Sequence, residues 1–320
     1  MTVALDMKHR CGMKIEQGIL RLSVVVTIVL AMAGAGIGIV VGSSAIVFDG
    51  VYGLIDAAMT GMALLVARLI AASNTADAAG GIYSRRFTMG FWHLEPLVLG
   101  VNGTLLIGAS VYAIINAVGA ILSGGHALAF GPVMAFTGAS LLVDMGMAIL
   151  VRRANRSIGS AFVALDARAW AMTSALSGAL FLSFIIGFAV QGGPYGWIAP
   201  YVDPIALILV CVVIIPGPFA TVRKALSEIL LVTPRDLWTQ VEEVAGKVVE
   251  QHGFVGHRAF VARVGRGIQI ELAFIVPEHW PARRLEEWDL LRDAIGDALG
   301  KDSPDRWLTI VFTTDPEWAY

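Results

Sequence analysis

The sequence predicts an α-helical membrane protein with six transmembrane helices, followed by a small C-terminal α+β domain. Of its 320 residues, 57% are hydrophobic and 15% are charged, whereas an ordinary soluble domain carries about 25% charged residues. The charges are also segregated, because residues 223–320 hold 16 of the 25 acidic residues. We therefore expect a cytoplasmic N-terminal tail over residues 1–21, a transmembrane domain over 22–222 and a cytoplasmic domain over 223–320.

The apolar runs set the number of membrane spans, because a membrane-crossing helix needs about 20 mostly apolar residues. The long uncharged run that begins at residue 96 is divided by a glycine-rich turn at residues 123–125. We expect six spans, which run near residues 22–43, 45–70, 96–122, 128–151, 161–190 and 203–222.

The basic residues predict the orientation of these spans. Ten of the eleven bases in residues 1–222 precede the first span or lie at the connections that follow the second and fourth spans. Basic connections stay on the cytoplasmic side, so we expect a multi-pass protein of the inner or cell membrane with both termini in the cytoplasm. These ten bases are Lys8, Arg10, Lys14, Arg21, Arg68, Arg85, Arg86, Arg152, Arg153 and Arg156.

The last hundred residues alternate between helical and strand-like patterns. Apolar residues recur with helical spacing over 235–251 and 285–299, and strand-like runs cover 259–264, 267–276 and 307–313. The order αββαβ is that of a small ferredoxin-like domain.

Several functional classes are disfavoured by the sequence. There is no run of basic residues, so nucleic acid is not an expected partner. The two cysteines, Cys11 and Cys211, are far apart and do not suggest a disulfide framework. No nucleophile–base pair or glycine-rich phosphate loop is visible, so we expect neither an enzyme nor a bound cofactor.

Acidic residues within the apolar runs are the main functional signal, because an ionisable side chain at membrane depth is costly and usually functional. The second span carries Asp49, Tyr52 and Asp56, whose spacing places them on one helical face. The fifth span carries Asp166. Oxygen ligands of this kind suit a divalent cation, and carboxylates can also carry protons.

Other polar residues have a structural interpretation. Asp203 is expected to cap the sixth helix, and Asp144 and Arg168 are expected to form an ion pair between the antiparallel fourth and fifth spans. Asp49 lies near the outer end of its span, where a solvated or capping role is an alternative. Three glycines of the first span are expected to allow close helix packing: Gly34, Gly36 and Gly38.

Four features together resemble the cation diffusion facilitator family. Residues 42–56 resemble its second-helix signature, and residues 86–95 resemble its loop into the third helix. The Asp203–Pro204 opening of the sixth span and the αββαβ tail are also similar to the family. The resemblance implies a homodimer in the lipid bilayer that exports zinc or a related divalent cation from the cytoplasm in exchange for protons.

The family's transport site uses two positions on the second helix and two on the fifth, which correspond here to Tyr52, Asp56, Ala169 and Thr173. The usual residues on the fifth helix are His or Asp and then Asp, and Tyr52 stands in place of His or Asp. Zinc prefers ligands rich in nitrogen or sulfur. Three interpretations remain: a harder ion such as Mn²⁺, Mg²⁺ or Fe²⁺ with retained waters, a shifted site that uses Asp49, Asp56 and Asp166, or a member that has lost transport.

The family's tail often binds a regulatory metal, and His257, Glu271 and Asp315 fall near the corresponding positions. Each of the three can also be a plain surface residue. The leading hypothesis is a cation/proton antiporter with Asp56 as the central ligand. The alternative is a transport-impaired homologue that acts as a metal-sensing or scaffold dimer in the membrane.

Overall fold

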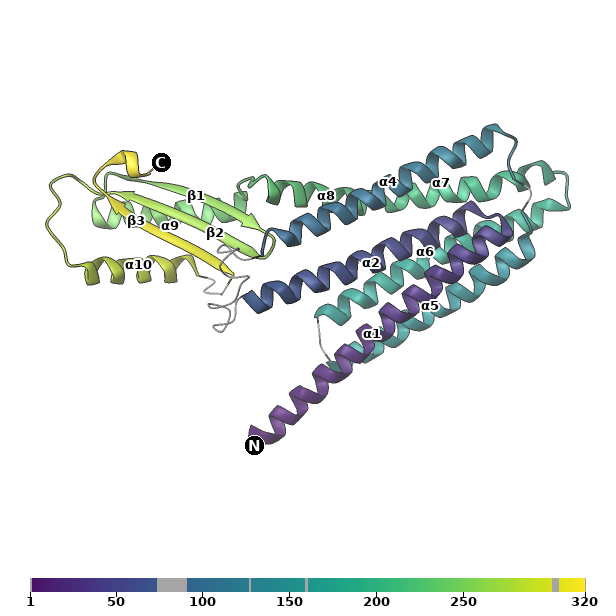
Figure 1. Ribbon diagram of the computed structural model, residues 1–320, viewed down its shortest axis with the longest axis horizontal. Helices are drawn as coiled ribbons and strands as arrows, with labels where there is room; N and C mark the ends of the chain where they lie inside the picture. The colour runs from purple at the N-terminus through teal and green to yellow at the C-terminus, as the bar shows by residue number, and fades with distance from the viewer. Residues whose placement is uncertain (1, 74–90, 127, 159–160, 301–304, 320) are drawn as a thin grey trace. The chain divides into compact units, whose positions relative to one another are not determined.

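The computed structural model describes residues 2–73, 91–126, 128–158, 161–300 and 305–319 (Figure 1). They belong to two compact units. The first comprises residues 1–61 and 102–219, and the second comprises residues 62–101 and 220–320. The described residues contain six helical segments that are long and apolar enough to cross a membrane, which confirms the predicted number.

The first five spans are single helices and the sixth is segmented. The sixth combines the 3-10 helix η2 (Gly196–Tyr201), α7 (Val202–Ile214) and α8 (Pro216–Ile229). Proline lacks the backbone N–H that would continue a helical ladder, and α8 begins at Pro216. The other five are α1 (Thr2–Val41), α2 (Ser44–Ser73), α4 (Leu94–Leu122), α5 (Phe130–Ile158) and α6 (Ala161–Gln191).

Two helix bounds differ from the sequence expectation. Helix α1 begins at Thr2, so the residues expected as a tail extend the helix of the first span, whose apolar membrane-crossing part is Gly18–Val41. Helix α5 ends at Ile158, seven residues beyond the predicted end at Val151. The additional turns of α5 change which residues of α5 and α6 lie opposite each other.

Helices α1 and α2 approach each other at glycines. A Cβ atom at Gly50 would lie 2.3 Å from the backbone nitrogen of Ala35, and one at Gly38 would lie 2.6 Å from that of Val47. No side chain fits at either point, so the two backbones are in direct contact. The expected close packing is confirmed for Gly34 and Gly38, whereas at Gly36 nothing lies within 4 Å of such a Cβ.

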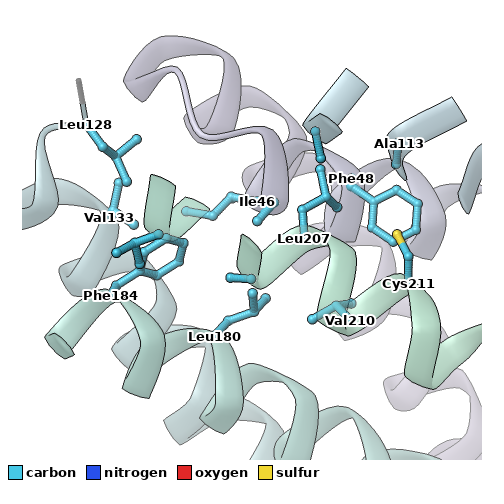
Figure 2. Close-up of a cluster of buried hydrophobic side chains, with 14 of the residues drawn as sticks. Ile46, Phe48, Ala113, Leu128, Val133, Leu180, Phe184, Leu207, Val210 and Cys211 are labelled. Carbon is cyan, nitrogen blue, oxygen red and sulfur yellow. The ribbon is translucent and has the colours of Figure 1, made fainter. Parts of the chain in front are cut away.

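The interior of the first unit is a hydrophobic cluster to which α2, α4, α5, α6 and α7 all contribute (Figure 2). Ile46 of α2, Phe184 of α6 and Leu207 of α7 are almost completely buried there. Cys211 of α7 is buried in the same cluster and is a free thiol. The cluster packs against one face of the N-terminal half of α2, the segment that carries Asp49, Tyr52 and Asp56.

The tail of the second unit has the predicted order αββαβ. It consists of α9 (Arg235–His252), β1 (Gly256–Val264), β2 (Gly267–Ile275), α10 (Leu285–Leu299) and β3 (Arg306–Thr313). Strand β2 is central, antiparallel to β1 and parallel to β3 (Figure 1).

Alternation along β2 separates the two faces of the sheet. Ile270, Leu272 and Phe274 are buried against Val241 of α9 and Ile295 of α10, so both helices cover the same face. Gly265 adopts a φ of +60° in the turn between β1 and β2. A residue with a Cβ atom is rarely stable in that conformation, which explains why glycine occupies this position.

Candidate cation site

Asp56 lies on α2, and its side chain is exposed in the isolated chain. The side-chain amide of Asn102 on α4 donates a hydrogen bond to its carboxylate. Among the side chains that the structure describes, Asp56 forms no ion pair. No base in that part of the chain therefore cancels the charge of the ionised carboxylate, which has lone pairs that a cation can use.

Tyr52 lies one turn before Asp56 on the same helix. Its ring centroid is 5.6 Å from that of Phe48, and its phenol interacts electrostatically with Asp56 and with Cys211 of α7. The structure thus brings Tyr52 and Asp56 together, as the helical spacing predicts. Their oxygens and the amide of Asn102 form a small polar group between α2 and α4.

Asp49 lies two turns before Asp56 and faces a different neighbour. Its carboxylate interacts electrostatically with that of Asp144 on α5. Asp144 is only 2% exposed, and its Oδ2 atom accepts a hydrogen bond of 2.6 Å from the hydroxyl of Ser177 on α6. Sequence reasoning missed Ser177, because serine occurs in membrane helices for many reasons.

The predicted ion pair between Asp144 and Arg168 is wrong. Asp144 lies beside Ser177, which is nine residues, or about 13 Å of helix, beyond Arg168. The prediction ended the fourth span at Val151, but α5 continues to Ile158. That extension of seven residues shifts the antiparallel register by about two helical turns. The Arg168 side chain is exposed.

Asp166 lies where α6 meets α1. Its Oδ2 atom accepts a hydrogen bond of 2.5 Å from the hydroxyl of Ser23, and the Ser23 oxygen accepts one of 3.0 Å from the indole nitrogen of Trp170. Asp166 precedes Ser177 by eleven residues, which is about 16 Å along the helix. The structure therefore does not bring Asp166 close to the Asp49–Asp144 pair.

The two fifth-span positions of the family's transport site lie on α6 and contribute little to the candidate site. Ala169 and Thr173 are both exposed, and the Thr173 hydroxyl donates to the Ala169 carbonyl oxygen at 3.2 Å. In the described part of the chain, no group of three or more His, Cys, Asp or Glu side chains could hold a metal ion. A bound cation would therefore need neutral oxygen ligands or water in addition to Asp56.

Asp203 is a cap, but of a different helix from the one predicted. Its carboxylate accepts hydrogen bonds from the Ser43 hydroxyl at 2.5 Å, the Ser44 amide at 2.8 Å and the Ala45 amide at 3.3 Å. These groups form the N-terminus of α2, whereas α7 has Tyr201 as its N-cap. Asp203 thus fixes the start of the helix that carries the candidate site.

The three tail residues are not brought together. His257 pairs with Phe274 across the sheet, and Phe260 pairs with Glu271. Since Phe274 and Glu271 are three residues apart on one strand, His257 and Glu271 lie on opposite faces of the sheet.

Each of these residues has a local partner instead. His257 Nε2 lies 3.2 Å from an oxygen of Glu242 on α9, and Glu271 accepts a hydrogen bond from Gln269 at 2.8 Å. Asp315 accepts one from the backbone amide of Glu317 at 2.9 Å. A tail metal site that uses all three residues has no support in this arrangement.

Six membrane-crossing helices with carboxylates between them define a multi-pass membrane protein of the ion-transport class. The family model described as the cation efflux transmembrane domain matches residues 20–230. The chain therefore belongs to the cation efflux, or cation diffusion facilitator, family and is a metal cation transporter. Among curated proteins no match was found. Part of the motif that resembles the family's third-helix loop, residues 86–90, lies outside the described residues.

Proposed function

We propose that the protein exports a divalent cation from the cytoplasm in exchange for protons, with Asp56 as the central ligand. The observation that carries this proposal is the environment of Asp56. Its hydrogen-bond donor is the neutral amide of Asn102, and no basic side chain in the described part of the chain pairs with it. A carboxylate of this kind can be neutralised in turn by a metal ion and by a proton.

The ligand chemistry supports a hard cation. Tyr52 adds a phenol oxygen near Asp56, and Asn102 adds a neutral amide rather than a second charge. Oxygen ligands favour Mg²⁺ or Mn²⁺, which keep several waters when few protein ligands are present. We therefore propose Mn²⁺ or Mg²⁺ ahead of Zn²⁺ as the transported ion.

The membrane orientation and assembly are part of the same proposal. The basic residues at the connections after the second and fourth spans support cytoplasmic termini in the inner or cell membrane. Membership of the cation efflux family supports a homodimer. Residues 223–320 would then form a cytoplasmic domain that contributes to dimerisation.

The experiment is a flux assay with the full-length protein in liposomes under an imposed pH gradient. Separate samples contain Mn²⁺, Mg²⁺, Fe²⁺ or Zn²⁺, and internal dyes report the metal and the pH. We expect metal flux coupled to opposite proton flux, which Asp56→Asn abolishes. Asp293→Asn, at an exposed acid of α10, serves as the control and should transport normally. Full flux in Asp56→Asn would overturn the role of Asp56.

A second candidate function is a metal-sensing or scaffold dimer that does not transport. It is favoured by Ala169, which has no ligand atom, and by Thr173, whose hydroxyl is bonded to its own helix. This candidate predicts that the same liposomes show no flux of any of the four metals, while the purified protein still binds metal. Robust flux of one metal would exclude it.

A further inference from the structure

We propose that Asp49, Asp144, Ser140 and Ser177 form a second cation site in the transmembrane part, separate from Asp56. It would take a hard divalent cation such as Mn²⁺ or Mg²⁺. The inference rests on the proposed function in one respect, which is that both sites bind the same class of cation. It depends on four oxygen-bearing side chains from α2, α5 and α6.

Asp144 is the centre of this site. Its side chain is 2% exposed, and its Oδ2 atom accepts the Ser177 hydroxyl at 2.6 Å. Its Oδ1 atom is buried and has no hydrogen-bond partner among the residues that the structure describes. A buried carboxylate oxygen without a partner is unfavourable, because no hydrogen bond replaces the ones that it made to water. A metal ion bound to Oδ1 would remove that penalty.

Ser140 adds a second unsatisfied group on the same helix. It is 8% exposed, and its buried hydroxyl oxygen has no hydrogen-bond partner in the described part of the chain. Ser140 and Asp144 are four residues apart, so their side chains lie on the same face of α5. Two buried polar atoms without partners among the described residues thus lie on one face of α5, which points to a ligand between them.

Asp49 supplies the second negative charge. Its carboxylate interacts electrostatically with that of Asp144, and two like charges in a poorly solvated site repel each other. The nearest base of α6 along the chain, Arg168, is about 13 Å of helix from Ser177 and is exposed. A divalent cation between the carboxylates would balance both charges, with Ser140 and Ser177 as neutral ligands.

The site is distinct from Asp56. Asp49 and Asp56 are seven residues apart, which is about 10 Å along α2. Asp49 interacts with Asp144, whereas Asp56 interacts with Tyr52 and Asn102, so we assign the two carboxylates to different ions. The two sites would therefore be successive positions on one path through the membrane.

The experiment counts bound Mn²⁺ in the purified full-length protein by the electron paramagnetic resonance signal of the free ion. The wild type should bind two ions per chain, and Asp144→Asn or Asp49→Asn should each remove one. Asparagine keeps the size of the side chain and its hydrogen bond to Ser177. A purely structural role for Asp144 would therefore leave the count unchanged. The double variant should lose no more than either single variant, because both residues hold the same ion.

Two serine variants provide a matched pair that leaves the charges intact. Ser140→Ala removes a ligand without breaking any hydrogen bond, and it should weaken binding at this site about tenfold, or roughly 1.4 kcal/mol. Ser174→Ala is the control, because the Ser174 hydroxyl donates to the carbonyl oxygen of Trp170 in its own helix at 2.8 Å. It should bind Mn²⁺ like the wild type.

The outcomes separate this inference from the proposed function. An unchanged Mn²⁺ count in Asp49→Asn and Asp144→Asn, or unchanged affinity in Ser140→Ala, overturns the second site even if the liposomes transport metal. A protein without flux whose Mn²⁺ count falls in these variants supports the second site and overturns transport. Asp56→Asn should remove the other ion and leave the Asp49–Asp144 ion bound.

Discussion

The acids of the membrane-spanning helices and those of the tail have different partners. In the tail, acids pair with bases at the surface, as in Glu243–Lys247 at 2.7 Å and Asp289–Arg292 at 2.6 Å. In the transmembrane unit, acids accept hydrogen bonds from hydroxyl groups of other helices, such as Ser177. Among the side chains that the structure describes, all ion pairs lie in the second unit, within residues 62–101 and 220–320.

The difference shows what a hydroxyl donor does that a base cannot do. A lysine or arginine cancels the charge of a carboxylate, whereas a serine fixes its position and leaves the charge in place. At membrane depth an additional base would also be costly to bury. Hydroxyl donors therefore keep acids ordered and still able to attract a cation, which a transport path requires.

The largest effect is expected at Asp203. Asp203→Ala removes the acceptor of the Ser43 hydroxyl and of two backbone amides, and it should lower the free energy of unfolding by about 3 kcal/mol. Asp203→Asn retains part of the cap and should cost less. Denaturant unfolding in detergent measures both variants. A wild-type midpoint for Asp203→Ala would show that the hydroxyl and amide bonds do not hold the acid as described.

A smaller effect is expected at Ser23, which joins α1 to α6. Ser23→Ala leaves the Asp166 carboxylate and the Trp170 indole without their shared partner, at a cost of about 1.5–2 kcal/mol. The same unfolding measurement applies. Ser183→Ala is the control, since the Ser183 hydroxyl donates to the Ala179 carbonyl oxygen of its own helix. Equal stability of the Ser23→Ala and Ser183→Ala variants would show that the Ser23 hydroxyl does not hold the Asp166 carboxylate in place.

The smallest effect is expected at Lys247 in the tail. Its hydrogen bond and its charge lower the pKa of Glu243 in the folded protein. The pair therefore stabilises the fold at pH values above 4.5, the ordinary pKa of glutamate. This contribution is lost as the pH falls through the lower pKa of the folded state. Both side chains are exposed, so Lys247→Gln should be barely distinguishable from the wild type near pH 7. At a pH below the lowered pKa of Glu243 the two melting curves should coincide. A large shift at neutral pH would contradict the weakness of surface ion pairs.

Local patterns made most of the fold predictable. Helix α10 begins and ends at the residues expected from the sequence, 285 and 299. Its apolar spacing and the glycine at residue 300 are local signals. The six spans followed from hydropathy and length. The break at Pro216 and the extension of α5 to Ile158 were missed, because neither changes the apolar character of its segment.

The candidate site was only partly predictable. Tyr52 and Asp56 follow from helical spacing, and the structure brings them together. The partner of Asp203 is 160 residues away in sequence, at Ser43, and no local signal identifies it. The neighbours of Asp144 depend on the register between two helices, and an error of a few residues in one helix end changes them completely.

The backbone contact between α1 and α2 has a consequence for the transport cycle. A carrier must alternately open to each side of the membrane, so some of its helices must slide or tilt against others. Helices that touch at Gly38 and Gly50 have no side chains between them to rearrange. We therefore expect α1 and α2 to move together as one rigid body. Asp49 and Asp56 would then change their neighbours on α4, α5 and α6, while the contact between α1 and α2 is kept.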